Sequence, residues 1–139
     1  MPERAERFAR ANHPRTVLAF DFGLKRIGVA VGEPELRTAH PLPAIAAPGF
    51  DAISKLISEW HPAQIVVGLP IAANGEHPLA RRVERFARQL EGRFHLPVAR
   101  VDERFSSVEA QSRLRGVKRQ RVDSVAAQLL LEQYFHEAA

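Results

Sequence analysis

Short apolar runs along the first third of the chain predict a set of strands. Thr16–Asp21 forms one such run, and Ile27–Val31 forms another after a five-residue link. So short a link between two strands is typical of a hairpin. A third extended segment is expected over Thr38–Ile45, where Pro41 and Pro43 favour an edge position because proline cannot donate a hydrogen bond inside a ladder.

The apolar positions then change to helical spacing and alternate with further strands. Helices are predicted over Asp51–Trp60, around Leu79–Leu90, at about Ser106–Leu114 and at Val122–Phe135, and strands over Gln64–Gly68 and Val98–Asp102. This order excludes an all-helical bundle or a sandwich and predicts an α/β fold. Opposite the apolar stripe of the second helix lie Arg81, Arg85 and Arg88, for which a solvated face is favoured over phosphate binding.

Length and composition are those of one globular domain. With 139 residues, 45% hydrophobic and 26% charged, we expect a single domain over residues 1–139, with residues 1–15 as a charged N-terminal extension. No apolar run is long enough for a membrane span, and the N-terminus lacks the apolar centre of a secretory signal. A cytoplasmic protein without disulfides is therefore expected, since cysteine is absent.

The net charge and the spacing of the histidines limit which partners and which metal sites are expected. The net charge of +4 and the sequence pI of about 10.3 favour an acidic polymer such as nucleic acid as partner. The six histidines show no i, i+4 spacing, which argues against a histidine zinc site.

Acidic residues lie at the carboxyl ends of two predicted strands and at the start of the last predicted helix. Asp21 ends the first strand, and Asp102 and Glu103 end the fifth, where alternation lets only one of the two point toward a site. Asp123 heads the apolar face of the last helix, either as an N-cap or as a third site carboxylate. If these carboxylates converge, their mutual repulsion is expected either to raise their pKa values or to require a cation between them, and hard oxygen ligands select Mg²⁺ or Mn²⁺.

Several motifs spanning about Val17–Phe135 together resemble the YqgF/RuvX family of bacterial proteins, the pre-16S rRNA nucleases and Holliday-junction-resolvase-like proteins. They are Phe20-Asp21-Phe22-Gly23, Lys25-Arg26-Ile27-Gly28-Val29-Ala30-Val31, Ile65-Val66-Val67-Gly68-Leu69-Pro70, Asp102-Glu103-Arg104 and Val122-Asp123-Ser124. The combination is specific, whereas any one of these motifs alone would be weak.

The resemblance implies an RNase H-like fold with a mixed five-stranded sheet flanked by helices, and an acidic site that binds Mg²⁺ or Mn²⁺. It assigns catalysis and metal binding to Asp21, Glu103 and Asp123, with Asp102 less favoured. The family loop after Gly-Leu-Pro usually carries an Asn and an Asp, but here those positions hold Ala72 and Asn74, so this loop is not assigned a role.

The implied activity is that of a divalent-metal-dependent endonuclease on structured RNA or branched DNA. It would process the 5′ end of pre-16S rRNA in ribosome biogenesis or resolve Holliday junctions in recombination and repair, and symmetric junction cleavage would need a homodimer. We expect seven basic residues to bind nucleic acid: Lys25, Arg26, Arg104, Arg115, Lys118, Arg119 and Arg121.

Two other functions compete with the nuclease. A ribosome-assembly or recombination factor could hold nucleic acid and cut slowly or not at all, although a mere binder of phosphate gains nothing from clustered carboxylates. Sugar kinases and actin-like ATPases share a related fold, but they close two domains on ATP, and the Gly-x-x-x-x-Gly-Lys phosphate loop is missing here.

Overall fold

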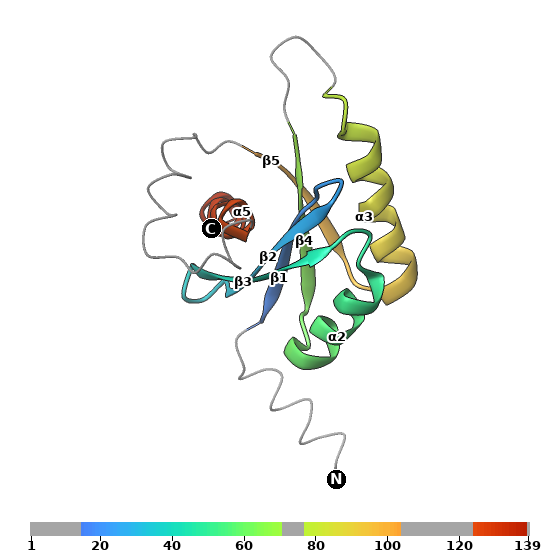
Figure 1. Cartoon of the computed structure of the whole chain (residues 1–139). Helices are drawn as coiled ribbons and strands as arrows, with labels where there is room; N and C mark the ends of the chain where they lie inside the picture. Colours follow the sequence, from blue (N-terminus) through green and yellow to red (C-terminus); the bar gives the residue numbers. More distant parts are fainter. Residues whose placement is uncertain (1–14, 71–76, 104–123, 139) are drawn as a thin grey trace.

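A central sheet with helices on both faces forms the described part of the chain, which comprises residues 15–70, 77–103 and 124–138 of a computed structural model (Figure 1). The strands are β1 (Val17–Asp21), β2 (Arg26–Glu33), β3 (Thr38–Ala46), β4 (Gln64–Leu69) and β5 (Val98–Asp102), and the helices are α2 (Phe50–Trp60), α3 (Ala80–Phe94) and α5 (Val125–Ala138). The predicted α/β fold is confirmed. The helix predicted at Ser106–Leu114 and the loop positions Ala72 and Asn74 lie outside the described residues.

The sheet has the strand order β3-β2-β1-β4-β5 and is mixed. β1 pairs with β2 in antiparallel register, with Asp21 opposite Gly28, so the predicted hairpin is confirmed, although β2 already begins at Arg26. β3 is an edge strand, as its prolines predicted. β4 runs parallel to both β1 and β5. The carboxyl ends of these three strands therefore lie at the same end of the sheet.

Side chains that alternate along the strands build two apolar cores, one on each face. Leu18, Phe20 and Val67 pack in the core shared with α2 and α3, whereas Ala19 and Val66 pack against α5. Because alternation continues to the strand ends, Asp21 and Gly68 belong to the face that α5 covers. Within the described ranges no helix is long and apolar enough to cross a membrane.

The start of α5 is tied to the middle of the sheet through a buried hydroxyl. Ser124 is fully buried, and its Oγ accepts a hydrogen bond of 2.9 Å from the backbone N–H of Val29. Val29 lies at the register shift between β2 and β3, a place where a strand's backbone groups are free to bond outside the ladder. The beginning of α5 is thereby fixed over β2 at the level where β1 ends.

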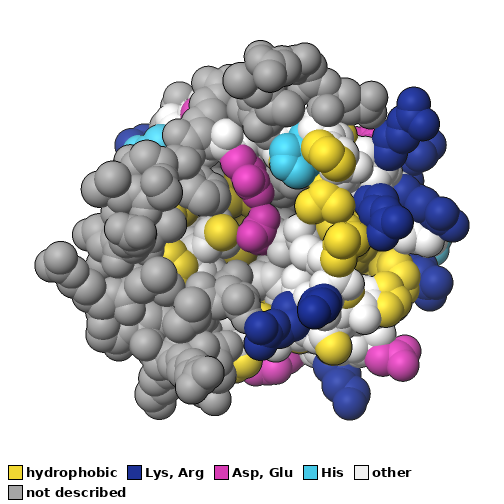
Figure 2. Space-filling model, turned by 45° about the horizontal axis from the view of Figure 1, so that its top comes forward, with side chains coloured by type: hydrophobic (Ala, Val, Ile, Leu, Met, Phe, Trp, Pro, Cys, Tyr) yellow, Lys and Arg dark blue, Asp and Glu magenta, His cyan; other side chains and the backbone are white. Residues whose placement is uncertain are grey.

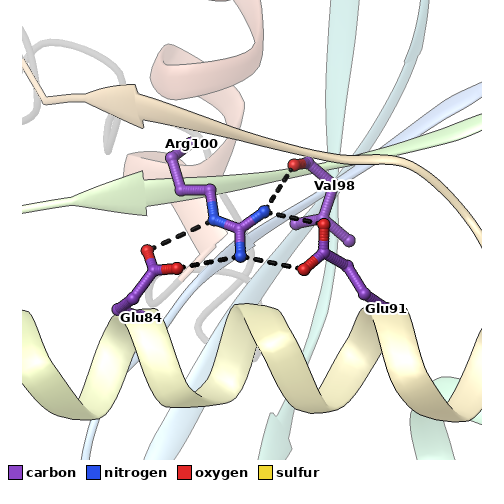
Figure 3. Close-up of polar contacts among 4 residues, drawn as sticks. All are labelled: Glu84, Glu91, Val98 and Arg100. Carbon is purple, nitrogen blue, oxygen red and sulfur yellow. Dashed lines mark hydrogen bonds and ion pairs between the residues drawn. The ribbon is translucent and has the colours of Figure 1, made fainter.

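A guanidinium joins α3 to β5 (Figure 3). Arg100 of β5 donates to both carboxylate oxygens of Glu84 at 3.2 and 2.9 Å, and to both of Glu91 at 2.9 and 3.0 Å. It also donates to the Val98 carbonyl at 2.9 Å. The hydrogen bond from Arg100 lowers the pKa of Glu91, so this acid stays ionised beside its partner. Such forked pairing holds α3 in a defined position on the sheet.

Candidate functional site

Two carboxyl groups meet at the carboxyl ends of the parallel strands. Asp21 ends β1 and Glu103 directly follows β5, while β4 lies between these two strands. With neighbouring strands about 4.8 Å apart, the two backbones are separated by roughly 9.5 Å. The two carboxyl groups are nevertheless close enough for a hydrogen bond with Glu103 to contribute to the raised pKa of Asp21. The glutamate side chain must therefore reach across β4 to the aspartate.

Gly68 of β4 leaves the space that this crossing needs. A Cβ atom at Gly68 would lie 2.8 Å from Oε1 of Glu103 and 2.9 Å from Cδ2 of Leu130, both too close for real atoms. The backbone of Glu103 is fixed at the same place, because its N–H donates to the Leu69 carbonyl at 3.1 Å and extends the β4–β5 ladder. The glutamate is thus held between the bare backbone of β4 and the side chain of Leu130 from α5.

This environment favours the protonated form of Asp21. Burial raises its pKa most, followed by the hydrogen bond and the negative charge of Glu103, from 3.8 to about 8. Two carboxyl groups this close cannot both ionise without compensation, so the pair keeps one shared proton at neutral pH. A cation bound between them would provide the same compensation.

The neighbouring acid, Asp102, does not join the pair. Its side chain is exposed, whereas that of Glu103 is partly buried against Gly68. This separation is the alternation predicted for the end of the fifth strand. The backbone carbonyl of Asp102 accepts a hydrogen bond of 2.6 Å from Nε2 of Gln133, which anchors α5 to the same strand end.

Of the other predicted site residues, the described chain includes only Lys25 and Arg26, which are exposed at the β1–β2 hairpin next to Asp21. Asp123 and the basic residues of the segment that follows β5 lie outside the described residues, and these are Arg104, Arg115, Lys118, Arg119 and Arg121. Asp123 directly precedes Ser124 in the sequence.

The donors at the pair suit a hard divalent cation, but they do not complete its coordination. Both are carboxyl groups, the ligand type that Mg²⁺ and Mn²⁺ prefer. Among the residues that the structure describes, no group of three or more histidine or acidic side chains could hold a metal ion. A further ligand would have to come from outside the described ranges or from the substrate.

The surface around the pair combines negative and positive charge (Figure 2). Acidic side chains lie side by side near the middle of this end of the molecule, and lysine and arginine side chains gather beyond them on the side of α3. A separate hollow of about 380 Å³, lined by residues including Thr16, Glu33 and Trp60, lies at the opposite ends of β1 and β2. It contains neither Asp21 nor Glu103.

Sequence reasoning had identified the acids but not the residues that position them. The sequence pattern marked Gly68 only as the end of a predicted strand and as part of a motif, although a glycine in a buried strand between two strands that end in acids is a usable signal of close approach. Ser124 was likewise noted only as a neighbour of Asp123. Its bond to Val29 depends on a register shift in the β2–β3 ladder, which the pattern of residues does not reveal.

The sheet order, its two helical layers and the acid pair at the strand ends define an RNase H-like fold. A solved structure of Thermus thermophilus RuvC has this architecture and superposes with a TM-score of 0.57 over 88% of this chain and 95% of its own, at 15% sequence identity. At that identity the likeness concerns the fold alone.

Residues 15–137 match the RuvX family, described as Holliday junction resolvase. A protein of Nitrosomonas europaea is 53% identical over 86% of this chain and 88% of its own length, and one of Methylobacillus flagellatus is 52% identical over 97% of each. Both carry the provisional name of pre-16S rRNA nuclease. The chain belongs to the RuvX family.

A methyl group at position 68 should separate the acid pair. Gly68→Ala is expected to push the Glu103 carboxylate away, and so to lower the pKa of Asp21 from about 8 toward its ordinary value. Overpacking should also cost about 1–3 kcal/mol of stability. Carboxyl ¹³C NMR titration would measure the pKa. Gly92→Ala is the matched control, because nothing lies within 4 Å of a Cβ at Gly92. An unchanged Asp21 pKa in Gly68→Ala would contradict the crossing geometry.

The raised pKa of Asp21 should make the metal-free protein less stable as pH rises. The folded state keeps a proton that the unfolded state releases between the unperturbed pKa of 3.8 and the folded value of about 8, so stability falls across this window. In EDTA, Asp21→Asn should therefore raise Tm above that of the wild type at pH 8.5 and lose this advantage near pH 4. The gain should be several degrees, since 1 kcal/mol corresponds to about 2–8 °C. Asp102→Asn, at an exposed carboxyl, serves as the control. A Tm gain in Asp21→Asn that did not depend on pH would contradict the proton shared by the acid pair.

Proposed function

We propose that this chain is a divalent-metal-dependent nuclease that hydrolyses phosphodiester bonds in structured nucleic acid. The observation that carries the proposal is the contact between the carboxyls of Asp21 and Glu103 across Gly68. Membership of the RuvX family supports the class of reaction, phosphodiester hydrolysis. We further propose that the chain acts as one domain in the cytoplasm.

Paired carboxyls would repel a phosphate unless a cation is bound between them. Asp21 and Glu103 would hold Mg²⁺ or Mn²⁺ in place of their shared proton, since both offer hard oxygen donors from fixed backbone positions. Such an ion, when bound, supplies an activated water and stabilises the leaving oxygen. The protein's part is to hold the two carboxylates at one point and to keep that point partly shielded from solvent.

We assign the third carboxylate to Asp123. Support comes from its neighbour, because Ser124 is fixed to Val29, and Val29 directly follows Gly28, the residue that pairs with Asp21. The chain around position 124 is therefore anchored at the level of the acid pair. Completion of a three-carboxylate site by Asp123 would also explain why the described residues offer only two acids at this point.

The substrate is proposed to be precursor 16S rRNA, as the names of the relatives above half identity suggest. A four-way DNA junction is the alternative that the family's description suggests, and only that substrate would call for a homodimer. Lys25 and Arg26 lie on the hairpin beside Asp21 and are proposed to contact substrate phosphates. The same role is proposed for Arg104, Arg115, Lys118, Arg119 and Arg121.

A factor that binds nucleic acid without cutting it fits the acid pair less well. Phosphate contacts are made by basic groups, and a desolvated pair of carboxyls on the approach to phosphate weakens such binding. The acid pair is better suited to binding a cation, because a cation compensates the negative charge of both carboxylates.

Cleavage should require Mg²⁺ or Mn²⁺ and both paired acids. With a precursor 16S rRNA fragment, a four-way junction and a linear duplex as substrates, Asp21→Asn and Glu103→Gln should reduce cleavage to the metal-free level while leaving binding intact or improved. Asp123→Asn should do the same. Asp102→Asn, the matched control on β5, should stay close to wild type. Full activity in excess EDTA, or loss of activity in Asp102→Asn beside an active Glu103→Gln, would overturn the mechanism.

A further inference from the structure

The outward face of α3 carries a row of exposed arginines. Val83, Phe86 and Leu90 are buried against the sheet. Arg81, Arg85 and Arg88 are exposed on the opposite side of the helix, one or two turns apart. Figure 2 shows the basic side chains that gather on this side of the molecule, next to the face where the acidic side chains lie.

The two acids of α3, Glu84 and Glu91, are bound to β5 rather than to arginines of the same helix such as Arg88. Glu84 is four residues before Arg88, and Glu91 is three residues after it, which are the spacings of local ion pairs. Instead, both glutamates bond to Arg100 of β5, at distances down to 2.9 Å (Figure 3). They therefore occupy the flank of α3 that faces β5. A helix whose arginines served only local pairing would keep these acids on its outer face.

The row begins at the end of the molecule where the acid pair lies. α3 follows β4 and leads into β5, and these strands are parallel, so the helix runs back along the sheet from their carboxyl ends. Figure 1 shows α3 in this orientation along one side of the sheet. Arg81 is therefore nearest the level of Asp21 and Glu103, and Arg88 is further away. No acidic residue stands in the first turn of the helix.

We propose that the outward face of α3 is a second phosphate-binding surface, which holds one backbone of a double-helical arm leading away from the acid pair. This inference rests on the proposed nuclease function and specifies the shape of its substrate. Seven residues of helix separate Arg81 from Arg88, about 10 Å, which matches roughly three base-pair steps. The forked guanidinium is suited to phosphate oxygens, and contacts with phosphates carry no information on base sequence.

The test measures the binding of a labelled precursor rRNA hairpin by fluorescence anisotropy at a series of salt concentrations. EDTA is present throughout, so that the hairpin is not cut. Arg85→Ala/Arg88→Ala should weaken binding and lower the log–log salt slope by about 0.7–0.9 for each phosphate that the variant no longer binds. Arg85→Lys/Arg88→Lys keeps the charge and should retain most of the slope. A hairpin whose double-helical arm is too short to reach the arginines of α3 should bind the wild type only as well as the full-length hairpin binds the alanine variant.

The control removes two positive charges from elsewhere on the surface. Arg37→Asn/Lys55→Ala does so at exposed positions, and asparagine tolerates the left-handed backbone of Arg37, with φ of 52°. Its slope should match that of the wild type. An unchanged slope in the alanine variant, or an equal loss in the control, would overturn the second surface while leaving metal-dependent cleavage untouched. Conversely, if the wild-type protein cleaved none of the substrates, the proposed nuclease function would be refuted. The salt slopes would still show whether α3 binds phosphates.

Discussion

The structure depends most on the approach of two carboxyl groups across a strand that lies between them. Asp21 and Glu103 belong to strands that are not neighbours, and only the missing side chain of Gly68 lets them touch. Burial, the hydrogen bond with Glu103 and its negative charge then raise the pKa of Asp21 to about 8, so that the metal-free pair keeps a proton at neutral pH. This pairing is unfavourable for stability, which suggests that it persists because function requires it.

The surrounding structure serves to hold this carboxyl pair in place. α5 covers the same face of the sheet, with Leu130 against the glutamate, and it is tied to the strands through Ser124 and Gln133. On the other face, Arg100 fixes α3 and takes up the two glutamates of that helix. Negative and positive side chains are therefore separated on the surface. The acid pair lies at the strand ends, and the arginines lie on the outer side of α3. Under the proposed function, a polyanion would approach along the basic side chains, and its scissile phosphate would meet the proposed cation site at the acid pair.

Much of this arrangement could be predicted from local patterns, and the remainder depends on tertiary structure. Apolar runs predicted all five strands, because buried strands leave a short signal that Gly and Pro punctuate. The positions of Asp21 and Glu103 at strand ends followed from the same runs, and alternation implied that Asp102 and Glu103 would point apart. The family resemblance, rather than periodicity, favoured Glu103. Gly68 is a signal of close approach only once β4 is known to lie between the two strands that end in acids. The pairing of Glu84 and Glu91 with Arg100 could not be predicted, because it depends on which helix lies beside which strand.

The most direct test of the central claim is anomalous diffraction from crystals of the full chain soaked in Mn²⁺. The account predicts a manganese ion bound by carboxylate oxygens of Asp21 and Glu103 together, no direct hydrogen bond between the two carboxyls, and Asp123 completing the site. A manganese ion bound elsewhere, or an Asp21–Glu103 hydrogen bond that survives saturating Mn²⁺, would contradict the assignment of this carboxyl pair as the metal site of the nuclease.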